Sequence, residues 1–295
     1  IGGSKDEAAY GLDLGIEYDL YVTGGTNSNS FNYGVGGAST NNFGGRADGF
    51  LIRLHKNTGD LLAATMLGTP AYDQSYFVKT DKYGKPFVYG QSEGSPGVSP
   101  NVYSNAGSKQ FIAKYNRTLT AIELQTIFGA SGKSMPDISP TAFLVDECER
   151  IFISGWGGFS LGGFSGAGTL KMPITSNAIQ KNTDGQDFYL AVFSKNLREL
   201  LFSTYFGGIG TVNTSSAEHV DGGTSRFDKK GIIYQSVCGG CHRQSLFPTT
   251  PGAWSRTNNS DNCNNALFKI DFENLNRKPV SKDSLYAITV TDTLD

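Results

Sequence analysis

Charged residues are scarce in this sequence. They make up 18% of its 295 residues, against about 25% in an average globular chain. The 25 basic and 27 acidic side chains leave a net charge of −2. Because there is no basic excess to attract a phosphate backbone, the composition argues against electrostatic binding of nucleic acid. We therefore expect no nucleic-acid partner.

Long apolar runs are also missing. No stretch approaches the roughly 18 consecutive apolar residues that a membrane-spanning helix needs, so we expect no membrane-spanning segment. The chain opens with Ile1-Gly2-Gly3-Ser4 and has neither an initiating Met nor an apolar leader. We therefore expect that any signal peptide has already been removed.

Glycine and aromatic residues are the abundant types. The chain contains 38 glycines, 19 phenylalanines and 14 tyrosines, and glycine is well above its usual share of about 7%. The glycines have no period of three, which excludes a collagen triple helix. The aromatic content excludes a disordered chain. The composition predicts a strand-rich protein with many turns.

Four segments of the chain follow one plan. Their boundaries lie near 1–67, 68–128, 129–206 and 207–273. Each opens on glycine and continues with two strands joined by a turn, a long connection and further strands. In two units the first turn reads Asp-x-x-Gly, at Asp81 to Gly84 and Asp228 to Gly231. This form suits a tight hairpin, since Asp accepts local backbone hydrogen bonds and Gly adopts positive φ.

The predicted strands recur at matching places in the units. In the first halves they are 10–14, 20–25, 76–79, 87–90, 142–145, 151–155, 225–227 and 232–235. In the second halves they are 50–54, 61–67, 111–115, 122–128, 189–193, 200–206 and 266–270. Several of them are apolar at both odd and even positions, which indicates that both of their faces are covered.

We predict an all-β fold, a β-propeller over residues 1–273 built from four-stranded antiparallel blades. A solenoid of stacked repeats is the alternative, although β-solenoids use shorter periods and fewer hairpins. The last unit lacks a fourth-strand pattern and four blades make a tight ring, so we expect at least four blades of a larger ring. Residues 274–295 are predicted to form an exit strand or linker towards a following β domain.

Several phrases resemble a known repeat. Those closest to the seven-bladed β-propeller (SBBP) pattern stand at 21–26, 202–208 and 247–254, with a weaker copy at 172–180 and a departure from it at 98–101. The runs Val237-Cys-Gly-Gly-Cys241 and Asn262-Cys-Asn-Asn265, with the phrase at 247–254, resemble the propeller region of very large surface proteins of gliding bacteria of the Bacteroidota.

This resemblance implies a location and a set of partners. It implies a secreted protein on the outer surface of a Gram-negative bacterium, exported by the type 9 secretion system and linked to gliding motility. The partners it implies are other domains of the same large protein, cell-surface or secretion-system proteins, or surface glycans.

The four cysteines are Cys148, Cys238, Cys241 and Cys263. In an exported protein an even number favours disulfides. Of the three pairings we favour Cys241–Cys263 together with Cys148–Cys238 across neighbouring blades. The alternatives are free thiols and a Cys₃His zinc site with His242, although adjacent Cys241 and His242 are awkwardly placed to share a metal. A redox role for the Cys-x-x-Cys motif is disfavoured because no helix follows it.

One glycine-rich loop, 155–164, holds a cluster of aromatic residues. Trp156, Phe159 and Phe164 can stack on a sugar ring or on a partner's side chain. The alternative is that these rings fold back onto the neighbouring blade.

His219 is the histidine with carboxylates close by, Glu218 before it and Asp221 after it. Such neighbours can orient a catalytic group, and we include His219 among the candidate ligand contacts. We favour a polar loop histidine, because no nucleophile motif accompanies it.

Two oxygen-rich loops, 184–187 and 258–262, carry calcium-ligand types. Neither has the full EF-hand form, and Asx turns explain them better. No cofactor is predicted, with Ca²⁺ and Zn²⁺ as the alternatives. In the tail, Asp283-Ser284-Leu285 and Asp292-Thr293-Leu294 resemble Bacteroidota O-glycosylation sites, with Ser284 and Thr293 as acceptors.

No catalytic constellation is recognised in the sequence. We therefore predict a non-enzymatic propeller module with an adhesion, structural or protein-interaction role. The alternative is a carbohydrate-binding or carbohydrate-cleaving propeller that uses Glu218, His219 and Asp221.

Overall fold

The chain is all-β, with its strands arranged in antiparallel sheets. The computed structural model describes residues 2–28, 35–39, 44–158, 168–210, 218–220 and 225–272. Residues 274–295, predicted as an exit strand, lie outside these ranges. No helix within them is long and apolar enough to cross a membrane.

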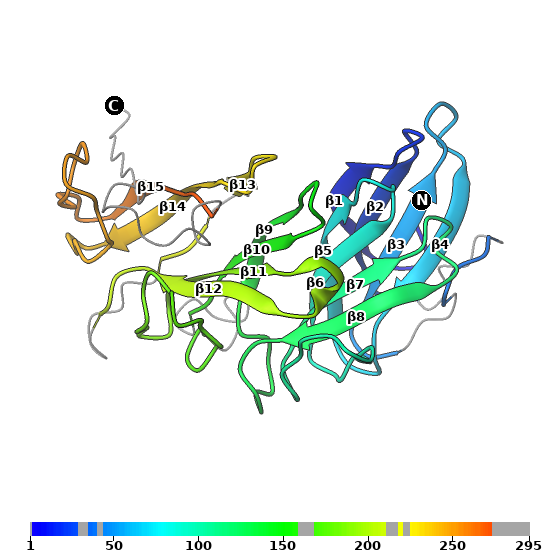
Figure 1. Ribbon diagram of the computed structural model, residues 1–295, viewed down its shortest axis with the longest axis horizontal. Helices are drawn as coiled ribbons and strands as arrows, with labels where there is room; N and C mark the ends of the chain where they lie inside the picture. Colours follow the sequence, from blue (N-terminus) through cyan, green and yellow to red (C-terminus); the bar gives the residue numbers. More distant parts are fainter. Residues whose placement is uncertain are drawn as a thin grey trace. The chain divides into compact units, whose positions relative to one another are not determined.

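Each sheet is formed by consecutive strands in chain order (Figure 1). The first contains β1 (Glu7–Leu14), β2 (Leu20–Thr26), β3 (Asp48–Leu54) and β4 (Leu61–Leu67). The second contains β5 (Asp73–Thr80), β6 (Pro86–Ser92), β7 (Gln110–Tyr115) and β8 (Ile122–Phe128). The third contains β9 (Ser139–Val145), β10 (Ile151–Trp156), β11 (Phe188–Phe193) and β12 (Leu200–Phe206), with the 3₁₀ turn η2 (Lys195–Leu197) before β12. The fourth contains β13 (Ser225–Phe227), β14 (Ile233–Cys241) and β15 (Cys263–Ile270).

The strands predicted from the sequence are confirmed in each sheet, with bounds that differ mainly by a few residues at their ends. The largest difference is in β14, which runs on to Cys241 where the sequence predicted a strand over 232–235. This extension carries the Cys-Gly-Gly-Cys motif inside a strand.

The two Asp-x-x-Gly hairpin turns are also confirmed. The Asp81 carboxylate accepts the backbone N–H of Tyr83 at 2.9 Å, and Gly84 adopts a φ of +73°. Asp228 and Gly231, with a φ of +81°, repeat the arrangement. The aspartate thus satisfies backbone donors that the turn leaves open, and the glycine takes a conformation that a side chain would strain.

The described chain divides into two compact units. The first comprises Ile1–Pro136, Glu147–Ile151 and Ser194–Glu199, and the second comprises Asp137–Asp146, Phe152–Phe193 and Leu200–Asp295. The first and second sheets belong to the first unit, and the fourth sheet with most of the third belongs to the second unit.

In the first unit, strand β3 of the first sheet is buried on both faces. Leu51 of β3 belongs to a core cluster shared with the second sheet, in which Val88 and Phe111 take part. Its neighbours Phe50 and Ile52 point the other way and join a separate cluster. Alternation of side chains along a strand sends successive residues to opposite faces, so apolar residues at both parities are required here. This confirms the prediction that strands with apolar residues at both odd and even positions are buried on both faces.

In the second unit aromatic rings join the third and fourth sheets. Phe268 of β15 lies 4.7 Å from Phe206 of β12 and 5.5 Å from Phe188 of β11, measured between ring centroids. Phe247 and Phe272 extend the cluster on the fourth-sheet side. Tilted and edge-to-face ring pairs of this kind add to the gain from apolar burial.

Phe268 tests this core because its ring contacts rings on two strands of the third sheet. We expect Phe268→Ala to lower the free energy of unfolding by about 3–5 kcal/mol, because it removes a ring that is 2% exposed and leaves a cavity. Urea denaturation followed by Trp fluorescence measures the loss. The matched control is Leu267→Ala, one residue away and 37% exposed, which we expect to cost at most about 1 kcal/mol. Equal losses in the two variants would contradict this packing.

Candidate functional site

The candidate site is the connection between β14 and β15, residues 242–262, which we call the closed loop. Cys241 ends β14 and Cys263 begins β15, and the two residues face each other in the strand pairing. Their Sγ atoms are bonded at 2.00 Å across a sequence separation of 22. The predicted Cys241–Cys263 disulfide is confirmed, and it joins the two ends of the loop.

Hydrogen bonds and one ion pair shape the closed loop next to the disulfide. The backbone N–H of Arg243 donates to the carbonyl of Ser260 at 2.9 Å, and its guanidinium pairs with the Asp261 carboxylate at 2.5 Å. Further along, the Asn258 amide Nδ2 donates to the Gly240 carbonyl at 3.1 Å. The loop therefore folds back on the strand that it leaves.

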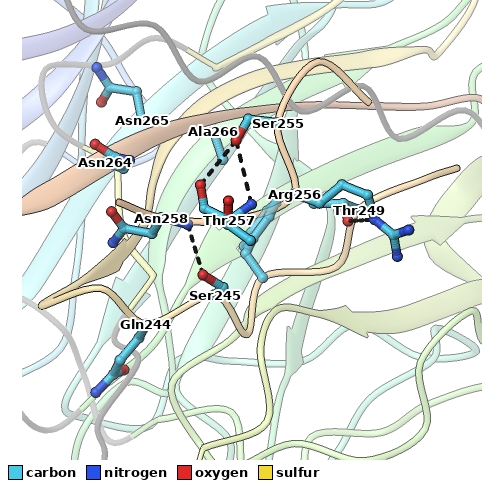
Figure 2. A pocket seen from close by; sticks show the side chains of 12 residues that line it. Gln244, Ser245, Thr249, Ser255, Arg256, Thr257, Asn258, Asn264, Asn265 and Ala266 are labelled. Carbon is cyan, nitrogen blue, oxygen red and sulfur yellow. Dashed lines mark hydrogen bonds between the residues drawn. The ribbon is translucent and has the colours of Figure 1, made fainter. Parts of the chain in front are cut away.

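A pocket opens between this loop and the strands beneath it (Figure 2). Its empty volume is about 300 Å³, including the open mouth. The strands contribute Gly239, Asn264, Asn265 and Ala266, and the loop contributes Gln244, Ser245, Phe247, Thr249, Ser255, Arg256, Thr257 and Asn258. Many of these residues carry amide or hydroxyl groups, but the surface that they present to the pocket is mainly apolar, and the charged residue among them is Arg256.

Several lining side chains are held in place by hydrogen bonds within the loop (Figure 2). Ser245 Oγ accepts the backbone N–H of Asn258 at 2.7 Å, and Arg256 Nε donates to Thr249 Oγ1 at 3.2 Å. The lining is thus positioned before any ligand arrives, which lowers the entropy cost of binding.

Trp254 lies on the closed loop between two lining residues in sequence, and 82% of its surface is exposed. Tryptophan is one of the residue types enriched among the hot spots of protein interfaces. The other tryptophan, Trp156, is only 9% exposed. Of the two, Trp254 therefore has the ring surface that a ligand can contact.

The predicted Cys148–Cys238 pairing is wrong. Neither residue forms a disulfide in the structure: Cys148 lies exposed in the turn between β9 and β10, and Cys238 is buried in β14. The Sγ atom of Cys238 instead lies 3.7 Å from that of Cys241. The error has a physical cause, since the strand pairing of β14 aligns Cys238 with Asn265 and with His219.

Of the other predicted contact residues, Trp156 and His219 are brought together. Their ring centroids lie 5.7 Å apart, and Trp156 is part of the core of the second unit. Trp156 therefore packs inward, which agrees with the alternative that these rings fold back, and little of its side chain is exposed. Phe159, Phe164, Asp221, Ser284 and Thr293 lie outside the described residues.

Glu218 and Asp187 form a buried acidic region in this unit. Both side chains are 0% exposed, and the Glu218 carboxylate accepts the N–H of Gly208 at 2.8 Å. Burial raises the pKa of Asp187 to about 7. Burial first, and repulsion from Asp187 second, raise the pKa of Glu218 well above its ordinary value. A carboxyl group without exposed surface cannot reach a substrate, so its role is structural.

The oxygen-rich loops form Asx turns, as the sequence predicted. Asp184 Oδ1 accepts the N–H of Gln186 at 2.9 Å, and Asn258 Oδ1 accepts that of Ser260 at 2.9 Å. Among the described residues, the group of cysteine, histidine and acidic side chains close enough to hold a metal is Cys238, Cys241 and Cys263. His242 is turned away to the Asp261 carbonyl, at 3.0 Å.

Sequence reasoning missed the pocket and the exposed Trp254. The segment 247–254 predicted a repeat unit and gave no indication of an exposed surface. A tryptophan in a loop between two cysteines, without the alternating apolar pattern of a strand around it, was the signal that could have found it.

Comparison with known proteins adds no relative to this site: the chain matches no protein-family model and no curated protein sequence.

The acidic region predicts a pH dependence of stability. Since the pKa of Asp187 is about 7 in the folded chain and 3.8 is the ordinary value, the folded state retains a proton that the unfolded state loses between these values. Stability should therefore fall as pH rises through this window, by on the order of 2–4 kcal/mol. Asp187→Asn should make the profile measured by urea denaturation between pH 4 and 8 shallower, and the buried Glu218 accounts for the slope that remains. Asp60→Asn, at an exposed turn, is the control that should leave the slope intact, and an unchanged slope in Asp187→Asn would refute the assignment.

Proposed function

We propose that the chain is a segment of a β-propeller that acts as a non-enzymatic module. The support is the repeated order of the sheets, each formed by consecutive antiparallel strands. In the first unit β5 lies against β1, and in the second β9 lies against β13. Within each unit the first strands of its two sheets therefore adjoin each other, as the inner strands of propeller blades do.

We further propose that the module works outside the cell, on the surface of a Gram-negative bacterium that uses type 9 secretion and gliding motility. The support is the resemblance to SBBP repeats and the Cys241–Cys263 disulfide, which suits an oxidising compartment. Its partners would then be neighbouring domains of a larger surface protein and proteins of the cell surface or of the secretion system.

The role we propose is adhesion through the closed loop. The observation that carries it is Trp254, which is 82% exposed on a loop that is tied at its base by a disulfide and that borders a preformed pocket. A rigid loop with an exposed aromatic anchor loses little entropy on binding.

Carbohydrate binding is the second candidate, favoured by the composition of the pocket. Its amide and hydroxyl groups can match the hydroxyls of a sugar, and the Trp254 ring offers a face on which a sugar can stack. Cleavage has no such support, because Glu218 is 0% exposed.

Trp254→Ala tests the adhesive role. We expect the purified chain to bind cells of a surface-grown Bacteroidota strain, and Trp254→Ala to weaken that binding at least tenfold because the exposed anchor is lost. Biolayer interferometry against outer-membrane vesicles from the same strain gives the affinity. Tyr234→Ala is the matched control, an exposed aromatic of β14 outside the closed loop, and should bind as the parent does. Equal binding by both variants would remove the closed loop from the function.

A glycan array separates the two candidates. Binding to defined glycans that is lost in both Trp254→Ala and the pocket variant Asn265→Ala would favour carbohydrate recognition. Vesicle binding with no glycan signal would favour a protein partner. Turnover of a polysaccharide by the chain would contradict the non-enzymatic proposal.

A further inference from the structure

Three sulfur atoms gather at the base of the closed loop. The Sγ atoms of Cys238, Cys241 and Cys263 all lie within 4.8 Å of one another. Cys241 and Cys263 form the disulfide, and the Sγ atom of Cys238 is 3.7 Å from that of Cys241. A thiol therefore lies next to a disulfide sulfur.

A β-bulge creates this arrangement. In a regular strand, residues three apart point to opposite faces, which would separate Cys238 from Cys241. The pairing of β14 with β15 shifts register between Cys238 and Gly240, and the extra residue turns both cysteines to one face.

Both glycines of the motif are needed for this bulge. A Cβ atom on Gly239 would lie 2.6 Å from the Cβ atom of Ala266, and one on Gly240 would lie 2.7 Å from the carbonyl oxygen of Gln244. Gly240 also has a φ of +149°. The sequence Cys-Gly-Gly-Cys therefore has a geometric reason in a strand, unlike motifs that precede a helix.

The three cysteines differ in their exposure to solvent. Cys238 is 5% exposed, Cys241 is half-buried and Cys263 is exposed. The residue with the thiol is thus the buried one, and the exposed residue belongs to the disulfide.

We propose that this cluster is a thiol–disulfide exchange site. The Cys238 thiolate attacks Sγ of Cys241, the Cys238–Cys241 bond forms and the Cys241–Cys263 bond breaks. The electron pair of the broken bond stays on Cys263, which takes up a proton equivalent to the one that Cys238 released. Nothing is oxidised or reduced overall, so no co-reactant is required.

The exchange changes how the closed loop is tied. A Cys241–Cys263 bond spans a separation of 22 residues, whereas a Cys238–Cys241 bond encloses only the two glycines. After exchange the base of the loop is held by contacts such as Arg243 with Asp261, and Cys263 becomes an exposed thiol. That thiol can form a mixed disulfide with a partner's cysteine. The exchange itself does not depend on the proposed adhesion.

The Sγ atoms of Cys238 and Cys241 must move from 3.7 Å to the about 2.05 Å of a disulfide. Because attack runs along the extension of the Cys241–Cys263 bond, the Cys238 thiol must also swing into line with that bond, since it now lies within 4.8 Å of the Cys263 sulfur. Gly239 and Gly240 supply the backbone freedom for this movement, since neither carries a side chain that restricts φ.

Tryptic mapping distinguishes the two bonds directly. Trypsin releases residues 231–243, with Cys238 and Cys241, and residues 257–269, with Cys263. The disulfide seen in the structure links these two fragments. The exchanged bond leaves them separate, with fragment 231–243 lighter by two hydrogen atoms and Cys263 alkylated. The measurement uses the full chain with Cys148→Ser, incubated in a glutathione redox buffer at pH 8, quenched with acid and alkylated with N-ethylmaleimide.

We expect a measurable fraction of internally bonded fragment 231–243 in the parent, and its rise to the main form in Cys263→Ser. Cys238→Ser is the control and should give only the linked fragments. Circular dichroism checks that each variant is folded, and if Cys263→Ser does not fold the parent alone decides. The proposal is overturned if the parent yields only linked fragments with Cys238 alkylated. It is likewise overturned if the reduced parent binds one equivalent of Zn²⁺ and never forms the internal bond, since the cluster would then be a metal site.

Discussion

Burial of both faces of the middle strands of the sheets is the constraint on which the rest of the structure depends. Every residue of β7, β10 and β11 is buried, and an isolated sheet cannot achieve this because its faces would meet water. Each sheet therefore needs a neighbour, and within each unit the next sheet along the chain provides one. The phenylalanine rings between the third and fourth sheets show the result: they fill the gap between two sheet faces that neither sheet could cover alone.

Because of that constraint, only the connections between the second and third strands are long within a sheet. The first and second strands of a sheet are joined by tight turns, as are the third and fourth, because their partners must stay in register. The second and third strands are joined by longer segments, 27–47, 93–109, 157–187 and 242–262. The closed loop is the last of these. Its pocket therefore arises where the fold allows insertions, and the strands beneath it supply a fixed floor.

The strands and the Asp-x-x-Gly turns could be predicted because their signals are local in sequence. The turn between β9 and β10 shows how far such local prediction reaches. It has no glycine, and Glu149 takes the left-handed conformation with a φ of +62°. Its buried carboxylate lies 2.6 Å from Lys195 and 3.8 Å from Lys82, partners that no local pattern reveals. The pocket and the position of Cys238 escaped prediction for the same reason, since a loop that folds on itself and a bulge in strand register follow from three-dimensional pairing.

The bulge links the two chemical features of the second unit. Gly239 lies in the pocket lining, and the register shift beside it aligns Cys238 with Cys241. Asn264 and Asn265 line the same pocket and follow Cys263 directly. If Cys241 changes its bonded partner, the backbone next to the cysteines must shift. That backbone includes Gly239, Asn264 and Asn265, which line the pocket. A disulfide between the loop ends alone would need no glycine pair and no third cysteine, so the presence of both favours a bond that can move over one that only fastens the loop.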